Sequence, residues 1–159
     1  DLGDSTDKPL FAVAANFLRN DRHHATANND LDDTQWSGDL VYKYRRFSVV
    51  GEYHYRESQP ETGAGFKDRG WLAQASYAFK APRHGPAAFW EIAFRYAEID
   101  PSSLRPGDRR KEIGGALGYY YNRHNLKVQA DFRNLKDDAA SSGEGTSNNE
   151  ARLQAQLIF

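Results

Sequence analysis

The most constraining feature of the sequence is an alternation of apolar and polar residues with a period of two. It is clearest at the C-terminus, residues 150–159, where alanine, leucine and phenylalanine alternate with charged and amide residues. Successive side chains of a β-strand point to opposite faces, so this pattern predicts a strand with one apolar and one polar face. The pattern recurs in seven more segments, and none has a convincing helical period: residues 10–19, 38–44, 47–56, 71–79, 90–96, 113–121 and 126–133.

The connections between these segments alternate in length. Short turns are expected at Arg45-Arg46 and at 122–125, and a turn of medium length, with two prolines and a glycine, at 80–87. Long polar connections rich in Asp, Asn, Ser, Gly and Pro are expected at 20–35, 57–69, 100–109 and 137–149. This order predicts an antiparallel up-and-down arrangement of about eight strands with both termini at the same end. Residues 1–8 are expected to form an N-terminal extension and residues 9–159 one β-barrel domain.

The apolar face carries large aromatic residues, mostly near the strand ends. Aromatic residues make up 13% of the chain. Two aromatic belts around a band of Ala, Val, Leu and Ile are typical of a transmembrane β-barrel, in which Tyr and Trp lie at the level of the lipid headgroups. The alternative is a soluble up-and-down barrel of the lipocalin type, which needs these residues inside. The residues are Tyr42, Tyr44, Tyr53, Tyr55, Trp71, Phe79, Trp90, Tyr119, Tyr121 and Phe159.

Composition excludes several other classes. The longest apolar run near the start, residues 10–15, is far shorter than the ~20 residues of a spanning helix. The net charge of −1 gives no electrostatic reason to expect nucleic-acid binding. The absence of cysteine excludes disulfides, thiolate metal sites and cysteine nucleophiles. A chain that starts without Met is expected to be processed or to be part of a longer protein.

Short motifs along nearly the whole chain resemble one family of outer-membrane proteins. The final amphipathic strand ending in Phe159 is similar to the last strand of bacterial outer-membrane β-barrels, which carries the assembly signal. Residues 90–96 (WEIAFRY), 70–77 (GWLAQASY), 39–44 (DLVYKY) and 47–53 (FSVVGEY) resemble the C-terminal half of phosphate-selective porins O and P. The resemblance implies a sixteen-stranded trimeric channel, of which this chain supplies about eight strands.

The polar face of the predicted strands is the main candidate site, and its acids and bases are balanced. In a closed eight-stranded barrel these groups would fill the interior as a salt-bridged network. In a wider barrel they would line a water-filled, ion-conducting lumen. The predicted lumen-facing residues are Asp39, Lys43, Glu52, His54, Arg56, Glu91, Arg95, Glu112, Lys127, Asp131, Arg133, Glu150 and Arg152.

Other motifs carry little chemical signal. His23-His24 and the acidic stretch 28–33 are expected to be solvated loop, because adjacent histidines do not converge on one ion and the acidic stretch lacks the features of a calcium loop. Gly114, Gly115 and Gly118 are followed by no helix and therefore do not form a phosphate loop. Nothing groups a nucleophile, a base and an orienting acid, so no enzymatic activity, metal or cofactor is expected.

These observations predict a porin-like barrel in the bacterial outer membrane that passes small hydrophilic solutes, including anions such as phosphate. The alternative function is a closed eight-stranded barrel that serves as a membrane anchor or binds partners through its loops. The expected partners are outer-membrane lipids, the barrel assembly machinery, and further barrel strands or other copies of the chain.

Overall fold

The fold is one sheet of antiparallel strands. A computed structural model describes residues 8–22, 31–81, 88–121, 126–138 and 145–157. None of the described segments is a helix that is long and apolar enough to cross a membrane. The strands are β1 (Leu10–Arg22), β2 (Leu31–Tyr44), β3 (Phe47–Pro60), β4 (Phe66–Lys80), β5 (Phe89–Asp100), β6 (Arg110–Tyr120), β7 (Leu126–Asp137) and β8 (Thr146–Leu157).

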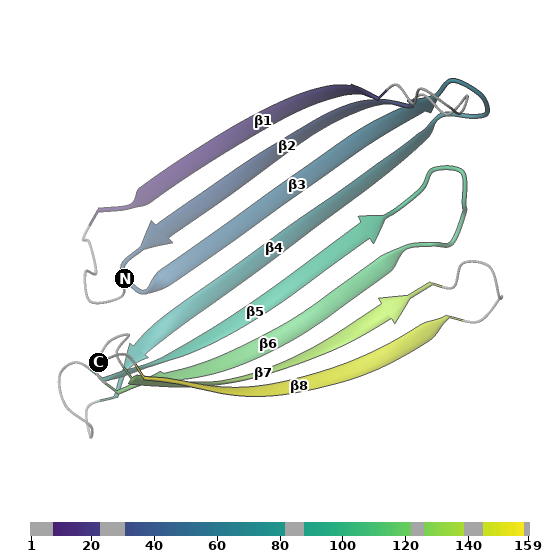
Figure 1. Ribbon diagram of the computed structural model, residues 1–159. Helices are drawn as coiled ribbons and strands as arrows, with labels where there is room; N and C mark the ends of the chain where they lie inside the picture. The colour runs from purple at the N-terminus through teal and green to yellow at the C-terminus, as the bar shows by residue number, and fades with distance from the viewer. Residues whose placement is uncertain (1–7, 23–30, 82–87, 122–125, 139–144, 158–159) are drawn as a thin grey trace.

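Each strand pairs with its neighbours in the sequence, in the order β1 to β8. All seven pairings are antiparallel. Because consecutive strands reverse direction, β1 begins and β8 ends at the same end of the sheet (Figure 1). We call this end, which also carries the Arg45-Arg46 turn, the short-turn end, and the opposite end the long-loop end. The all-β up-and-down fold expected from the alternation is confirmed.

The strands extend further towards the long-loop end than the sequence predicts. The prediction that residues 20–35, 57–69 and 137–149 are entirely loop is wrong at the edges of these segments. Leu31–Gln35 belong to β2, β3 continues to Pro60, and β8 begins at Thr146. Backbone hydrogen bonds continue the ladder whatever the side chains are, so polar residues extend the strands beyond the apolar band. The predicted turn at 122–125, the centres of two long loops and Phe159 lie outside the described residues.

The sheet has an apolar face that no other part of the described chain covers. Phe17 is 71% exposed, Phe94 56% and Leu153 77%. Among the described residues, the buried hydrophobic set consists of small residues and one tyrosine: Ala78, Ala81, Ala88 and Tyr120. A soluble barrel would bury its large apolar residues in a core. The exposed apolar face instead fits a sheet that is surrounded by lipid.

The sheet is open within the described residues. Among the described strands, β1 is hydrogen bonded only to β2 and β8 only to β7, so each outer strand has one edge without a paired neighbour. Figure 1 shows the strands lying side by side across a curved sheet whose two outer strands stay apart. The arrangement is that of a partial barrel. Strand edges with free N–H and C=O groups are sites for pairing with further strands.

Candidate functional site

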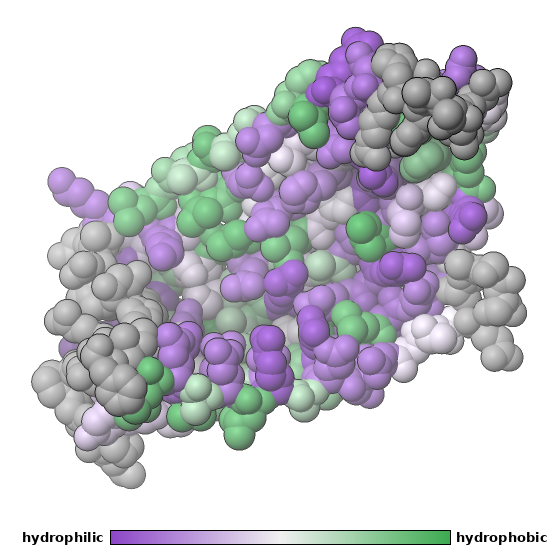
Figure 2. Space-filling view, in the orientation of Figure 1, coloured by the Kyte–Doolittle hydropathy of each residue, from purple (hydrophilic) through white to green (hydrophobic). Residues whose placement is uncertain are grey.

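The register of the strands places all the predicted lumen-facing residues on one face. Arg56 lies opposite Asp68, Asp131 opposite Arg152, and Arg133 opposite Glu150. Figure 2 shows hydrophilic residues spread over much of the face in view, with hydrophobic residues scattered among them and along the upper margin. A hollow of about 340 Å³ on this face is lined by residues of β4 to β8. We call this face, which contains all the predicted lumen residues, the polar face.

A chain of ion pairs crosses the polar face from β5 to β8. The Arg95 Nε lies 3.3 Å from one Glu112 oxygen, and the other Glu112 oxygen lies 4.0 Å from Arg133 Nη1. Arg133 also donates from Nε to Glu150 at 2.8 Å. Gly114 lies directly opposite both arginines, and a Cβ there would be 3.3 Å from the Phe132 carbonyl oxygen. The glycine therefore leaves room for two arginines to lie beside each other.

Two further arginines on this face are held by carboxylates directly across the strand pair. Arg152 Nε donates to Asp131 Oδ1 at 2.9 Å, and Arg56 Nε donates to Asp68 Oδ2 at 2.6 Å. Asp68 was missed in the sequence analysis because it lies in a segment interpreted as loop. Asp68 is an even number of residues from Gln74 on the same strand, and this spacing could have predicted that both lie on one face.

The charged groups of the polar face are accessible to water in this open sheet. The side chains of Arg95, Arg133 and Arg152 are 47%, 44% and 66% exposed. Their carboxylate partners are less exposed, at 20% for Glu112 and 17% for Asp131. The guanidinium groups therefore stand out from the sheet while the carboxylates lie closer to it.

The short-turn end of the polar face carries cations that have no carboxylate partner among the described residues. Lys43 is the next-to-last residue of β2, Lys80 is the last of β4, and Lys127 is the second of β7. None of these three, the short-turn lysines, lies within 4.0 Å of a carboxylate in the described part of the chain. The nearby acid Glu91 instead accepts a 3.0 Å hydrogen bond from the Tyr120 hydroxyl. The sequence balance of acids and bases therefore hides an uneven distribution along the strands.

Tyr120, like Lys80, is a further residue of the polar face that was not predicted from the sequence. Its ring stacks on Phe89 of β5, with the centroids 4.3 Å apart. A Cβ on Gly118 would lie 2.9 Å from the Tyr120 ring, so the glycine makes space for it. Tyr120 is an even number of residues from Glu112 along β6, and this spacing could have placed it on the polar face. It was overlooked because its neighbours Tyr119 and Tyr121 are aromatic residues of the apolar face.

Asp33 and Ser58 form a buried contact near the long-loop end. Both residues are 1% exposed, and the Ser58 hydroxyl donates to Asp33 Oδ1 at 2.5 Å. The sequence analysis placed both in solvated loops. Their burial shows that β2 and β3 remain well packed beyond the apolar band.

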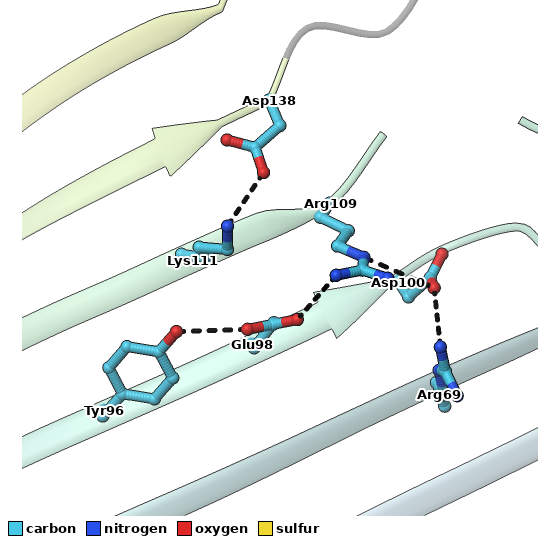
Figure 3. Close-up of polar contacts among 7 residues, drawn as sticks. All are labelled: Arg69, Tyr96, Glu98, Asp100, Arg109, Lys111 and Asp138. Atoms are coloured by element: carbon cyan, nitrogen blue, oxygen red, sulfur yellow. Dashed lines mark hydrogen bonds and ion pairs between the residues drawn. The ribbon is translucent and has the colours of Figure 1, made fainter. Parts of the chain in front are cut away.

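The opposite face changes from apolar to charged at the long-loop end. Along β5 this face carries Trp90, Ile92, Phe94 and Tyr96, followed by Glu98 and Asp100. In Figure 3, Glu98 contacts Tyr96 and Arg109, and Asp100 contacts Arg109 and Arg69. Lys111 binds Asp138 at 3.0 Å nearby. Aromatic, aliphatic, aromatic and then charged residues follow the order expected across a bilayer and its headgroups.

These features define a class of protein. Backbone groups inside a bilayer must all be hydrogen bonded, which leaves only helices and closed barrels as spanning structures. A curved up-and-down sheet with a lipid-compatible face, aromatic belts and a water-accessible charged face is part of a membrane-spanning β-barrel.

The comparison with known families identifies the chain further. Residues 14–159, nearly the whole chain, match the family described as phosphate-selective porin O and P. The chain therefore belongs to this family, as the resemblance in its motifs led us to expect, and is a porin-like outer-membrane β-barrel protein. No curated protein and no solved structure matches it significantly.

Proposed function

We propose that the protein forms part of a pore in the bacterial outer membrane, and that this pore passes small hydrophilic solutes with a preference for anions such as phosphate. The observation that carries the anion preference is the set of short-turn lysines, Lys43, Lys80 and Lys127, on the polar face. A cation with no carboxylate beside it attracts a passing anion, whereas an ion-paired arginine is largely neutralised.

The remaining ion pairs have a different role in this proposal. Each of these charges stabilises the wall of the lumen, because it has an opposite charge on an adjacent strand: Arg95, Glu112, Arg133 and Glu150. Their exposure to water keeps the lumen wet. The apolar face contacts outer-membrane lipids, and the barrel assembly machinery inserts the chain.

A pore also needs a wider barrel than this sheet can close alone. The interior of an eight-stranded barrel is just wide enough for side chains to fill it. The free edges of β1 and β8 support pairing with further strands, from a longer chain or from other copies. A closed eight-stranded anchor receives less support, because it would need these two edges to meet.

The test replaces the short-turn lysines together, as Lys43→Gln, Lys80→Gln and Lys127→Gln. We expect reconstituted channels to keep conducting but to lose anion preference, as measured by the reversal potential in a salt gradient across a planar bilayer. The matched control is Lys136→Gln, which removes an exposed lysine that also has no carboxylate partner among the described residues but lies on the opposite face.

Two results would contradict the proposal. An unchanged reversal potential in the triple variant would reject the lysines as the source of selectivity. A parent protein that inserts into the bilayer and does not conduct would reject the pore.

A further inference from the structure

Asp39, Glu52 and His54 form a cluster on the polar face that the ion-pair network does not include. Asp39 of β2 lies directly opposite Glu52 of β3, and His54 follows Glu52 on the same face. One nitrogen or oxygen of each of the three side chains lies within 4.8 Å of those of the other two. His54 Nε2 and Glu52 Oε2 are 3.8 Å apart.

No lysine or arginine of the described residues forms an ion pair with the carboxylates of this cluster. Elsewhere on the polar face, Asp68, Asp131, Glu112 and Glu150 each have an arginine partner. Within the described residues, neither Asp39 nor Glu52 lies within 4.0 Å of a lysine or arginine. Two carboxylates directly across a strand pair repel each other. A bound cation would remove this repulsion.

The donor set indicates the kind of cation. Two carboxylates and one imidazole suit a divalent transition ion, because imidazole binds Zn²⁺ and its neighbours well while Mg²⁺ and Ca²⁺ prefer oxygen alone. Zinc sites with three protein ligands keep the fourth position for water.

The geometry allows all three side chains to reach one ion. Zn²⁺ bonds to nitrogen and oxygen are about 2.0–2.2 Å long, so two ligands of one ion are at most roughly 4 Å apart. The side chains of His54 and Glu52 are 62% and 41% exposed, which leaves them free to close the remaining distance.

We infer that Asp39, Glu52 and His54 bind a divalent transition-metal ion on the polar face. No metal site was expected from the sequence, because the loop histidines and the acidic run do not form one, whereas this site needs Asp39 from the neighbouring strand. If the polar face lines a pore as proposed above, the bound ion neutralises a negative patch in the lumen and strengthens the preference for anions.

The test is a calorimetric titration of ZnCl₂ into the detergent-solubilised full chain. The other histidines, His23, His24, His84 and His124, are first replaced by glutamine, so that His54 is the one imidazole left. We expect one equivalent of Zn²⁺ to bind per chain. His54→Gln in this background should weaken binding by at least roughly tenfold, the smallest loss typical of disturbing a metal-ligand shell.

The matched control is Glu57→Gln, which removes a carboxylate from the same strand but from the opposite face, and should leave Zn²⁺ binding unchanged. The site is rejected if His54→Gln binds Zn²⁺ as tightly as its background, or if Mg²⁺ binds as tightly as Zn²⁺. A double variant, Asp39→Asn with Glu52→Gln, gives a second measurement and should weaken Zn²⁺ binding at least as much as His54→Gln does.

The titration measures binding without conduction, so the site and the pore can fail separately. Zn²⁺ binding by a protein that does not conduct would reject the pore and keep the site. A conducting protein whose reversal potential is indifferent to Zn²⁺ and that shows no heat of binding would reject the site and keep the pore.

Discussion

The two faces of this sheet solve opposite problems with the same backbone. On one face Phe17, Phe94 and Leu153 project exposed hydrocarbon, which is unfavourable in water and favourable in lipid. On the other face Arg95, Arg133 and Arg152 form ion pairs that remain partly exposed to water. The contrast shows that this fold is stable only where its two faces meet two different solvents.

The comparison extends to the two ends of the sheet. At the long-loop end the apolar face gives way to a connected network of Arg69, Asp100, Arg109 and Glu98 (Figure 3). At the short-turn end the polar face presents lysines without carboxylate partners among the described residues. The two ends of the sheet therefore differ in how their charges are paired, so they can be told apart chemically.

The largest expected effect concerns which end of the sheet faces the outside of the cell, and the labelling that tests it is all-or-none. The chain has no cysteine, so single cysteines can be introduced and labelled selectively. We expect Arg105→Cys in the 101–109 loop to react with a bulky, membrane-impermeant maleimide on intact cells, because outer-membrane barrels carry their longer loops on the extracellular side. Arg46→Cys should react only after the outer membrane is permeabilised. If only Arg46→Cys were labelled on intact cells, the short-turn end would face the outside, opposite to the expected orientation.

The next largest effect tests whether the two faces of the sheet contact different solvents. Phe94→Lys places a charge on the apolar face, where a lysine near the bilayer midplane costs about 2–4 kcal/mol. Gln129→Lys places the same charge on the polar face of β7 and should cost much less. Urea unfolding in lipid vesicles measures both free energies. Equal losses would mean that both faces meet the same solvent.

A smaller effect tests the aromatic belt at the short-turn end. The rings of Trp90 and Tyr119 lie directly across β5 and β6, with centroids 4.5 Å apart. We expect a coupling of about 0.5–1.5 kcal/mol between them. A double-mutant cycle with Trp90→Leu and Tyr119→Leu measures it, and a coupling near zero would show that each ring packs against lipid alone.

The smallest effect on stability is expected on the polar face. Arg95 is 47% exposed, so Arg95→Ala should lower the free energy of unfolding by only about 0–1 kcal/mol while shifting ion selectivity. A packed interior would lose about 3–5 kcal/mol, because Glu112 would be left as a buried unpaired charge. Thermal unfolding and bilayer conductance on the same variant distinguish a wet lumen from a closed one.

The sequence predicted the number of strands, their order and the face of every residue proposed for the lumen. These features follow from a local period of two that does not depend on distant residues. The strand ends could not be predicted in the same way. Leu31–Gln35 and Thr146–Asn149 lack the alternation, yet they pair because their neighbours extend equally far.

The contacts of individual charges depended on the tertiary structure. The sequence alone placed Asp39, Glu52 and Arg56 on one face, but it could not say that Asp39 lies opposite Glu52 while Arg56 lies opposite Asp68. Register is set by hydrogen bonds between strands that are distant in sequence, and a shift along a strand changes every cross-strand pair. The alternation therefore determined which side chains face water and which face lipid, whereas only the register decided which charges are paired, which stay free and which could share a metal ion.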